Sequence, residues 1–474
     1  MVVDARPHRP RSAVDAARGV SLGNVVPRGQ RRSDGRHRRI RRGRNRGCSG
    51  TSPDTEDRGV RRRIAHLSLE QSRQHGSGTR VTQFSAEVRP TTTATSTRTL
   101  SILVVAETFL PVVNGVTNSV LRVTEHMSSR GHSLRVVAPG PGPAEHDGIP
   151  VHRTRSVSMP GYGGLRIGFD LASLDAAIED AQPDVIHVAA PAVLGSRALT
   201  RARELGIPTV AIYQTDLAGF ASRYHLTAAR RPIWRYVTSL HDRADLTLAP
   251  STAAVWDLRQ RGVSNVVRWM RGVDLERFNP VHRDEKLRRE LAPNGETIVG
   301  YVGRLAREKQ VERLAEVSRM PNVRVVIVGD GPLEAKLRRQ MPNAIFVGFK
   351  SGADLSRFHA SFDLFVHTGV DETFCQAVQE ALASGVPVVA PAAGGPLDLV
   401  QHGVNGFLWT EHSAVSLNGA VEELLRHPVK RERLAAAARA SVESRSWASV
   451  MSELEGHYMS VVTGLGFAYR GVQQ

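Results

Sequence analysis

Residues 363–390 constrain the fold more than any other stretch of the sequence. The apolar run 363–367 predicts a buried parallel strand. A helical pattern over 373–384 follows, with Gly385 as its left-handed stop, and the apolar run 386–390 predicts the next strand. These elements form one β-α-β unit. Its loop lies at the carboxyl end of a strand, where open α/β sheets bind ligands.

The loop and helix of this unit carry two carboxylates. Glu372 lies in the predicted loop, and Glu380 lies about two turns along the helix, where it is expected to accept the ribose hydroxyls of a nucleotide. The amides of Phe374 and Cys375 are expected to face outward at the helix N-terminus and bind a phosphate. Two such glutamates are also common on a solvent-facing helix. The run Ala393-Gly394-Gly395-Pro396 after the next strand completes a pattern that favours a nucleotide-sugar site.

The same alternation of strands and helices extends along most of the chain. It predicts an α/β fold with two Rossmann-like, doubly wound parallel sheets and a cleft between the two domains. One series of expected strands is 99–106, 134–138, 184–188, 209–213 and 246–249, and the other is 297–303, 323–328, 344–347, 364–367 and 386–390. The clearest expected helices are 116–129, 171–181 and 447–462.

Changes in composition divide the chain into five segments. A charged stretch with prolines and glycine predicts a linker between the two sheets, and the last helix is expected to cross back to the first domain. The expected segments are an Arg-rich arm at 1–97, a Rossmann-like domain at 98–280, a linker at 281–296, a second Rossmann-like domain at 297–446, and the crossover helix and tail at 447–474.

The positive charge is concentrated in the arm. Residues 1–100 hold 22 Arg, no Lys and 8 acidic residues, so they carry +14 of the net charge of +17 and leave +3 for the other 374 residues. Few large apolar residues occur there, which predicts disorder. We favour a segment outside the working protein, such as a translation start placed too far upstream. The alternatives are a basic arm that binds nucleic acid or acidic lipid and a transit peptide.

The cysteines and the hydropathy exclude two classes of protein. Cys48 and Cys375 lie in different regions, so they predict neither a disulfide framework nor a metal set, and a reducing cytoplasm is expected. No run of eighteen apolar residues occurs, so no membrane span is expected.

Further candidate residues follow strands of the second series. Arg304 and Lys309, just after Gly303, could neutralise a leaving diphosphate without a metal ion, although basic residues are also ordinary on surface helices. Gly329 and Asp330 follow the next strand. They either let the backbone approach a base or ribose or form a plain turn.

The first series offers its own candidates. Gly115, after Asn114, permits close approach to a phosphate or sugar, and the alternative is an ordinary turn. His187 ends a predicted strand and either faces the cleft or is structural. Asp216 is either an acceptor-binding residue or a helix N-cap. The glycine-rich loop 159–164 is typical of segments that line a substrate cleft.

Taken together, these motifs resemble the retaining glycosyltransferases of family 4, which have the GT-B fold. The resemblance covers about residues 100–465. The motifs are Glu372-x7-Glu380, Gly303-Arg304-Leu305 with Lys309, Asn114-Gly115-Val116, Arg271-Gly272-Val273-Asp274-x3-Phe278-x-Pro280 and Gly403-x2-Asn405-Gly406. Two longer segments, 106–116 and 210–220, resemble GDP-mannose-dependent α-mannosyltransferases of the mycobacterial type.

The resemblance implies that the second domain binds the nucleotide-sugar donor and the first binds the acceptor. It implies retention of anomeric configuration by front-face attack, with the leaving phosphate helping to deprotonate the acceptor, no cofactor, and a dispensable divalent metal. The implied catalytic residues are Glu372, Arg304, Lys309, His187 and Asp216. The implied donor-binding residues are Asn114, Gly115, Gly303, Arg304, Lys309, Gly329, Asp330, Glu372, Thr373, Phe374, Cys375 and Glu380.

Two departures from the family pattern concern the first domain. Many relatives carry His-x-His-Glu-Pro where this chain has His187-Val-Ala-Ala-Pro, so Ala189 replaces the usual site histidine and its role is expected to fall to His187. Relatives also often carry Tyr-His-Thr where this chain has Gln214 in the middle position.

The leading hypothesis is a mannosyltransferase that transfers mannose from GDP-mannose to a membrane glycolipid. The resemblance implies an acceptor of the phosphatidylinositol mannoside or glucuronosyl diacylglycerol type, a role in glycolipid and lipomannan biosynthesis, and peripheral association with the inner face of the plasma membrane. Arg153, Arg155 and Arg166, near the loop 159–164, are expected to meet anionic lipid.

Three alternatives stay open at this point. The first keeps the fold but uses a UDP- or ADP-sugar and a soluble acceptor. The second is a nucleic-acid-binding protein that acts through the basic arm, although no nucleic acid is expected as a partner. The third is a sheet scaffold that binds donor without turnover. The sequence leaves the oligomeric state open.

Overall fold

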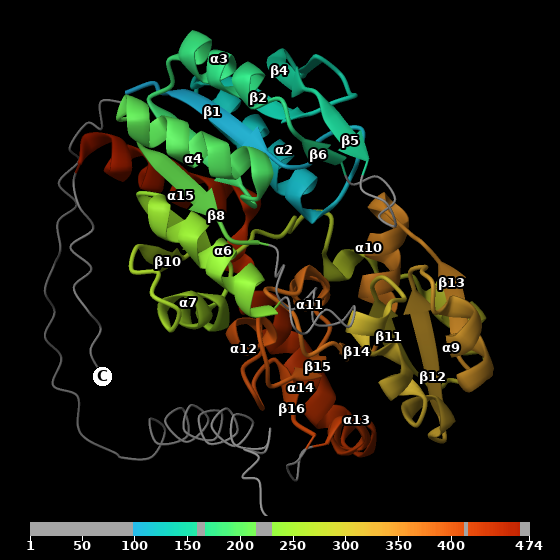
Figure 1. Ribbon diagram of the computed structural model, residues 1–474. Coiled ribbons are helices and arrows are strands. Elements are labelled where there is room, and N and C mark those ends of the chain that lie inside the picture. Colours follow the sequence, from blue (N-terminus) through green and yellow to red (C-terminus); the bar gives the residue numbers. More distant parts are fainter. Residues whose placement is uncertain (1–97, 159–165, 215–229, 412–415, 465–474) are drawn as a thin grey trace, which may run out of the picture. The chain divides into compact units, whose positions relative to one another are not determined.

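A computed structural model describes residues 98–158, 166–214, 230–411 and 416–464, which form two parallel sheets covered by helices (Figure 1). The predicted α/β class with two Rossmann-like sheets is confirmed. The arm 1–97 and the loop 159–164 lie outside the described residues, so the predictions for them are not addressed by the structure. Among the residues described, no helix is both long and apolar enough to cross a membrane.

The first sheet has the strand order β10-β9-β8-β7-β1-β2-β4-β3. All its neighbouring strands run parallel except β3 and β4, and a separate antiparallel pair joins β5 to β6. Its strands are β1 (Ser101–Ala106), β2 (Ser133–Pro139), β3 (Glu145–His146), β4 (Ile149–Thr154), β5 (Ser156–Ser158), β6 (Arg166–Gly168), β7 (Val185–Ala189), β8 (Thr209–Ile212), β9 (Leu246–Ala249) and β10 (Val266–Arg268). The helices of this part are α2 (Gly115–Ser129), α3 (Leu171–Ala181), α4 (Val193–Leu205), α6 (Arg230–Arg243) and α7 (Thr252–Arg259).

Strand β1 is apolar from Ile102 to Ala106, as expected for a strand whose sheet has helices on both faces. Ile102 and Val104 lie in one core cluster with residues of α2 and of the last helix, α15 (Trp447–Thr463). Leu103 and Val105, which point to the other face, lie in a second cluster with residues of α3 and α4. Figure 1 shows α15, in red, beside the strands of the first sheet, where it contacts α2, β7 and β8.

The second sheet has the order β13-β12-β11-β14-β15-β16, and all its neighbours run parallel. Numbered along the chain from β11, this is 3-2-1-4-5-6, the order of a dinucleotide-binding fold. The strands are β11 (Thr297–Val302), β12 (Val323–Val328), β13 (Ile345–Gly348), β14 (Leu364–Val366), β15 (Val388–Pro391) and β16 (Gly406–Trp409). The helices are α8 (Glu285–Leu291), α9 (Glu334–Gln340), α10 (Gly352–Ser361), α11 (Gln376–Ala383), α12 (Pro396–Leu399), α13 (Leu417–Arg426) and α14 (Pro428–Ala440), with short 3₁₀ turns between them.

The strands of this sheet also bury both faces. Ile298 of β11 packs with residues of α10, α11 and α14, whereas Val299 packs on the other face with residues of α9 and α13. Strand β11 pairs with β12 on one side and β14 on the other. The chain therefore reverses its direction of winding between β11 and β14. The loops after these two strands meet at that switch point.

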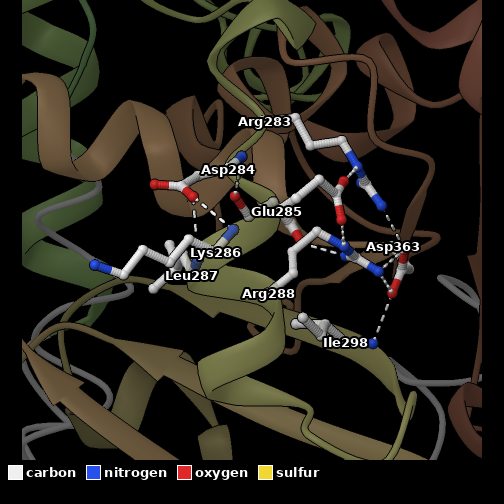
Figure 2. A network of polar contacts seen from close by, with 9 residues as sticks. Arg283, Asp284, Glu285, Lys286, Leu287, Arg288, Ile298 and Asp363 are labelled. Atoms are coloured by element: carbon white, nitrogen blue, oxygen red, sulfur yellow. Dashed lines mark hydrogen bonds and ion pairs between the residues drawn. The ribbon is translucent and has the colours of Figure 1, made fainter.

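The segment predicted as a linker is more ordered than expected. Helix α8 lies inside it, begins at the N-cap Asp284, and buries Leu291 in a core cluster of the second sheet. Figure 2 shows Arg288 reaching Asp363, 3.1 Å from Nη2 to Oδ2, while the same carboxylate accepts the amide of Ile298 at 2.8 Å. The charges that suggested a solvated linker thus attach α8 to the strands of the second sheet.

Candidate active site

The switch point of the second sheet brings together two loops that the sequence singled out. One begins at Gly303, directly after β11, and contains Arg304 and Lys309. The other runs from His367, directly after β14, to Cys375. Because β11 and β14 are paired neighbours, the two loops lie side by side at the carboxyl edge of the sheet. Ligands bind at this position in open α/β sheets.

A buried group of charges joins these two loops. Lys309 Nζ lies 2.5 Å from Glu372 Oε1, and His367 Nε2 lies 3.2 Å from the same oxygen. Thr368 Oγ1 donates a hydrogen bond to the Lys309 carbonyl oxygen at 2.6 Å, which links the loop backbones as well. The side chains of Glu372 and His367 are only 14% and 2% exposed, so solvent screens these contacts weakly.

The charges of this group stabilise one another. Burial favours the neutral form of Glu372, but a hydrogen bond from His367 and the charge of Lys309 outweigh it and lower the pKa of Glu372 to about 2. Burial alone would lower the pKa of His367, but attraction to Cys375 and Glu372 raises that pKa to about 10. Burial likewise opposes the charge of Lys309, and Glu372 keeps the pKa of Lys309 above its ordinary value. At neutral pH the group therefore holds a carboxylate between two cations.

The glycine run after β15 supports the loop that carries Glu372. The amide of Gly395 donates to the Glu372 carbonyl oxygen at 2.8 Å. A Cβ atom at Gly395 would lie 2.0 Å from the Phe374 carbonyl oxygen, and one at Gly394 would lie 2.2 Å from that of Glu372. Only glycine allows this approach. The sequence linked the run to the site, and the structure shows that it packs against the acidic loop.

The predicted start of the helix after this loop was wrong by three residues. Helix α11 begins at Gln376, not near Thr373, because Cys375 has a left-handed backbone with φ of 79°. A residue in this conformation cannot continue a right-handed helix toward its N-terminus. Cys375 is therefore the N-cap of α11, so the amides of Phe374 and Cys375 precede the helix, and phosphate binding by them stays a prediction.

Arg304 differs from Lys309 in its surroundings. Its side chain is 59% exposed and forms an ion pair with Glu308, four residues later. Both cations predicted to hold a diphosphate thus lie near the switch point. In this structure each has a carboxylate partner, Glu308 for Arg304 and Glu372 for Lys309.

The glycines after β12 pack against the backbone of the loop that follows β11. A Cβ at Gly329 would lie 2.1 Å from the Gly303 carbonyl oxygen, and one at Gly331 would lie 2.5 Å from that of Leu305. Leu305 N donates to the Asp330 carbonyl oxygen at 2.7 Å. The two loops therefore pack backbone to backbone. The space that the sequence assigned to an approaching base at Gly329 is filled by the neighbouring loop, and the side chain of Asp330 is exposed beside it.

Glu380 lies in α11, as predicted, and it interacts with His359 and with Arg271. Arg271 was not among the predicted site residues. Glu380 Oε2 is 3.6 Å from Nε2 of His359, whose side chain is fully buried. Burial lowers the pKa of Arg271 to about 10, while the charge of Glu380 partly offsets that effect. Arg271 Nη2 also donates to the Gly115 carbonyl oxygen at 2.7 Å. The motif beginning at Arg271 was the available signal for this residue.

Asn114 and Gly115 form a helix start in the structure. Asn114 Oδ1 accepts the amides of Val116 and Thr117, each at 3.0 Å, so Asn114 is the N-cap of α2. The alternative of an ordinary turn at these residues was wrong.

A second carboxylate, Glu107, was missed as a candidate. It directly follows β1, and its Oε1 accepts the amides of Ala192 at 2.7 Å and Gly195 at 2.9 Å, at the N-terminus of α4. Burial raises the pKa of Glu107, and these backbone hydrogen bonds partly oppose that rise. Glu107 therefore fastens α4 to the end of β1 at the switch point of the first sheet.

The prediction that His187 faces the cleft was wrong. His187 lies in the middle of β7, is 1% exposed, and its Nδ1 is 2.7 Å from the hydroxyl of Tyr458 on α15. Burial lowers the pKa of His187 to about 3, so the imidazole is neutral. His187 therefore cannot take the role of the family's site histidine, which Ala189 replaces in this chain. Asp216, the other first-domain candidate, lies outside the described residues.

The three arginines expected to meet lipid are occupied by the protein. Arg153 donates to the carbonyl oxygens of Pro139, Pro143 and Leu110. Arg155 pairs with Asp170 at 2.8 Å, and Arg166 donates to Ser156 and Ser158. These contacts hold the segment around β4 to β6 together, while the side chain of Arg155 stays 78% exposed, so the expected contact with anionic lipid stays a prediction.

The charged group also contains three possible metal ligands, and the expectation of no metal set from the cysteine count stays a prediction. A ring nitrogen of His367, a carboxylate oxygen of Glu372 and Sγ of Cys375 lie within 4.8 Å of one another. Cys375 is a free, buried thiol.

Comparison with known proteins yields two family matches. Residues 113–277 match the model described as Glycosyltransferase Family 4, and residues 282–441 match that described as Glycosyl transferases group 1. The chain is similar to "GDP-mannose-dependent alpha-mannosyltransferase" of Mycobacterium tuberculosis (strain CDC 1551 / Oshkosh), with 48% identity over 76% of this chain and 96% of that protein.

A more distant relative and a solved structure complete the comparison. "GDP-mannose-dependent alpha-(1-6)-phosphatidylinositol dimannoside mannosyltransferase" of Mycobacterium tuberculosis (strain ATCC 25177 / H37Ra) is 26% identical over 77% of this chain and 98% of that protein. The crystal structure of Anabaena Alr3699/HepE in complex with UDP matches with a TM-score of 0.63 and 24% identity, covering 76% of this chain and 99% of the other. The likeness to HepE concerns the fold alone.

Proposed function

This chain belongs to the family 4 glycosyltransferases, and on that premise we propose that it is a retaining α-mannosyltransferase that uses GDP-mannose as its donor. The 48% identity to a GDP-mannose-dependent α-mannosyltransferase supports this choice of donor. The observation that carries the proposal is the buried group of Lys309, Glu372 and His367 at the switch point of the second sheet.

The basic residues of the site suit a leaving diphosphate. Arg304 is exposed, and Lys309 lies within the buried group. A diphosphate bound between the two loops would replace Glu308 and Glu372 as the anionic partners of these two cations. Two fixed cations neutralise the charge that develops as the bond to the sugar breaks. A divalent metal is then dispensable, which is our proposal for the cofactor requirement.

The two glutamates take different parts of the donor. Glu372 contacts Lys309, one of the two cations assigned to the diphosphate. We assign Glu372 to the hydroxyls of mannose. Glu380 lies eight residues further along the chain, about one turn into α11, and we assign it to the ribose. Asn114 and Gly115, at the start of α2 and linked to Arg271, are assigned to the phosphate side of the reacting centre.

In the reaction, the bond between C1 of mannose and the diphosphate oxygen breaks, and a bond between C1 and the acceptor oxygen forms on the same face of the sugar. The acceptor proton passes to the leaving phosphate. The burial of His187 against Tyr458 supports this route, because the histidine expected near the centre is not placed to accept that proton.

We further propose that the acceptor is a glycolipid of the phosphatidylinositol mannoside or glucuronosyl diacylglycerol type. The name of the 26%-identical relative, a phosphatidylinositol dimannoside mannosyltransferase, supports a lipid acceptor. The enzyme would then work at the inner face of the plasma membrane as a peripheral protein. Arg153 and Arg166 are engaged within the protein, whereas the side chain of Arg155 is 78% exposed despite its pair with Asp170.

The test is a donor and acceptor profile of the full-length protein. GDP-mannose and UDP-glucose, each labelled in the sugar, are incubated with membranes or with soluble oligosaccharides, and the lipid and aqueous phases are counted. We expect label from GDP-mannose in the lipid phase, retained in the presence of a metal chelator. Label in lipid from UDP-glucose but not from GDP-mannose would refute the donor assignment.

Variants connect this activity to the site. Glu372→Ala should mainly lower turnover, and Glu380→Ala should mainly weaken donor binding. Glu422→Ala, a substitution of an exposed glutamate in the remote helix α13, is the matched control. Full activity in both site variants would remove the site from the proposal.

A further inference from the structure

The same loop places a thiol, an imidazole and a carboxylate together, and the reaction proposed above uses only the carboxylate. His367, Glu372 and Cys375 each direct one potential ligand atom to a common region, with all three atoms within 4.8 Å of one another. We propose that these three residues bind a thiophilic divalent cation of the zinc class, and that the bound cation blocks the sugar end of the donor site. The blocking rests on the proposed function, whereas the metal site itself does not.

The chemistry of the three ligands selects the kind of metal. One sulfur, one nitrogen and one oxygen ligand suit zinc, which binds thiolate, imidazole and carboxylate in tetrahedral sites. Magnesium and calcium prefer sites made wholly of oxygen ligands, so a single carboxylate beside a thiol does not suit them. Three protein ligands also leave a fourth position for water or another small ligand.

The imidazole of His367 provides an independent indication that a ligand belongs here. The side chain is 2% exposed, and among the described residues its Nδ1 has no hydrogen-bond partner, while Nε2 faces Glu372 Oε1 at 3.2 Å. Buried polar nitrogens are almost always hydrogen-bonded in folded proteins, and an unfilled ion site is one explanation for an exception.

The backbone leaves room beside these atoms. Gly369 lies so close that a Cβ there would be 3.3 Å from His367 Nε2 and 3.4 Å from Glu372 Oε1. Any other residue at this position would crowd the two ligands. The missing side chain therefore keeps the region in front of the imidazole and the carboxylate free.

Lys309 competes with the metal for Glu372, and this competition explains why a bound metal would block the donor site. Its ammonium lies 2.5 Å from Glu372 Oε1, so a cation that takes this oxygen must displace Lys309 or share the carboxylate with it. A metal at Glu372 would thus disturb both the residue assigned to mannose and a cation assigned to the diphosphate. Such a metal would inhibit transfer rather than assist it.

The chain offers a matched pair of variants for the test, because it has only two cysteines, Cys48 and Cys375. The full-length protein, freed of metal by a chelator, is titrated with Co²⁺ and with Zn²⁺ in competition with a chromogenic chelator. Tetrahedral Co²⁺ bound to a thiolate gives a sulfur-to-metal charge-transfer band in the near ultraviolet. We expect one equivalent of metal per chain and this band in the wild type and in Cys48→Ser.

Variants of the metal ligands should lose the metal binding that the control Cys48→Ser retains. Cys375→Ser should abolish the band, and both Cys375→Ser and His367→Gln should weaken Zn²⁺ binding by about tenfold or more. Lys309→Met should bind Zn²⁺ more tightly, by about tenfold or more, because the competing ammonium is gone. Tighter binding of one equivalent with the charge-transfer band retained requires the folded ligand set, so this variant separates loss of a ligand from loss of structure.

Two results would overturn the metal site: no stoichiometric binding of either metal, or a charge-transfer band that survives in Cys375→Ser and disappears in Cys48→Ser. In a parallel assay, Zn²⁺ should lower the binding of GDP-mannose to the wild type and leave that to Cys375→Ser unchanged. Metal binding through Cys375 in a protein that transfers no mannose would refute the proposed function alone. Mannose transfer in a protein that binds no metal would refute only the metal site.

Discussion

Replacing Glu372 by Gln should show how much the buried charges at the switch point contribute to stability. The substitution keeps the shape of the side chain but removes the negative charge between Lys309 and His367. The folded protein lowers the pKa of Glu372 from 4.5 to about 2, which corresponds to about 3 kcal/mol in favour of the folded state at neutral pH. We therefore expect Glu372→Gln to lower the free energy of unfolding by about 3 kcal/mol.

The pH dependence of this loss follows from the two shifted groups. The pKa of Glu372 is lowered on folding, so its contribution is present above the ordinary pKa of 4.5 and is lost as the pH falls toward 2. The pKa of His367 is raised, so its contribution is full below the ordinary pKa of 6.5 and is lost as the pH rises toward 10. The difference between wild type and variant should be largest between these two ordinary pKa values and shrink on either side.

Urea denaturation followed by circular dichroism, repeated across the pH range, measures this difference. The matched control is Glu422→Gln, which removes the same charge from an exposed pair with Arg426 on α13 and should cost less than about 0.5 kcal/mol. An equal loss in both variants, or a loss at Glu372 that does not change with pH, would refute the coupling of the three charges.

Three further predictions concern other contacts. Glu380→Ala should raise the KM for GDP-mannose about tenfold or more with a smaller effect on kcat, as steady-state kinetics would show. Tyr458→Phe should lower the free energy of unfolding by about 1–3 kcal/mol, because it leaves Nδ1 of the buried His187 without a partner, and kcat should stay unchanged. Gly395→Ala should cost about 1–3 kcal/mol and also lower kcat, because its Cβ would meet the Phe374 carbonyl oxygen at 2.0 Å. Stability within 0.5 kcal/mol of the wild type, about the usual effect of a surface change, would contradict the last two.

The features that the sequence predicted well depend on short stretches of chain. Strands β9 and β12 and helix α3 begin and end where their apolar patterns do, because periodicity and burial determine them locally. The meeting of Lys309 with Glu372 could be expected in outline, since parallel neighbours in a Rossmann order bring their carboxyl ends together.

The features that the sequence did not predict depend on contacts between distant residues or on rare backbone conformations. His187 meets Tyr458, which lies 271 positions away, and nothing near His187 in the chain indicates that contact. Cys375 has a left-handed backbone that non-glycine residues seldom adopt, so a propensity argument continues the helix through it. The role of Gly394 and Gly395 depends on the loop behind them and not on their own neighbours.

The position of α15 has a consequence for how the protein is made. Met451, Leu454 and Tyr458 fill the same core as the first strand, β1, although they are translated more than three hundred residues later. While the ribosome is still adding the second sheet, α2 covers part of one face of the first sheet, and the part that α15 will cover stays exposed. The amino-terminal half of this enzyme is thus finished last, and a nascent chain stalled before Trp447 would present bare apolar strand surface to chaperones and proteases.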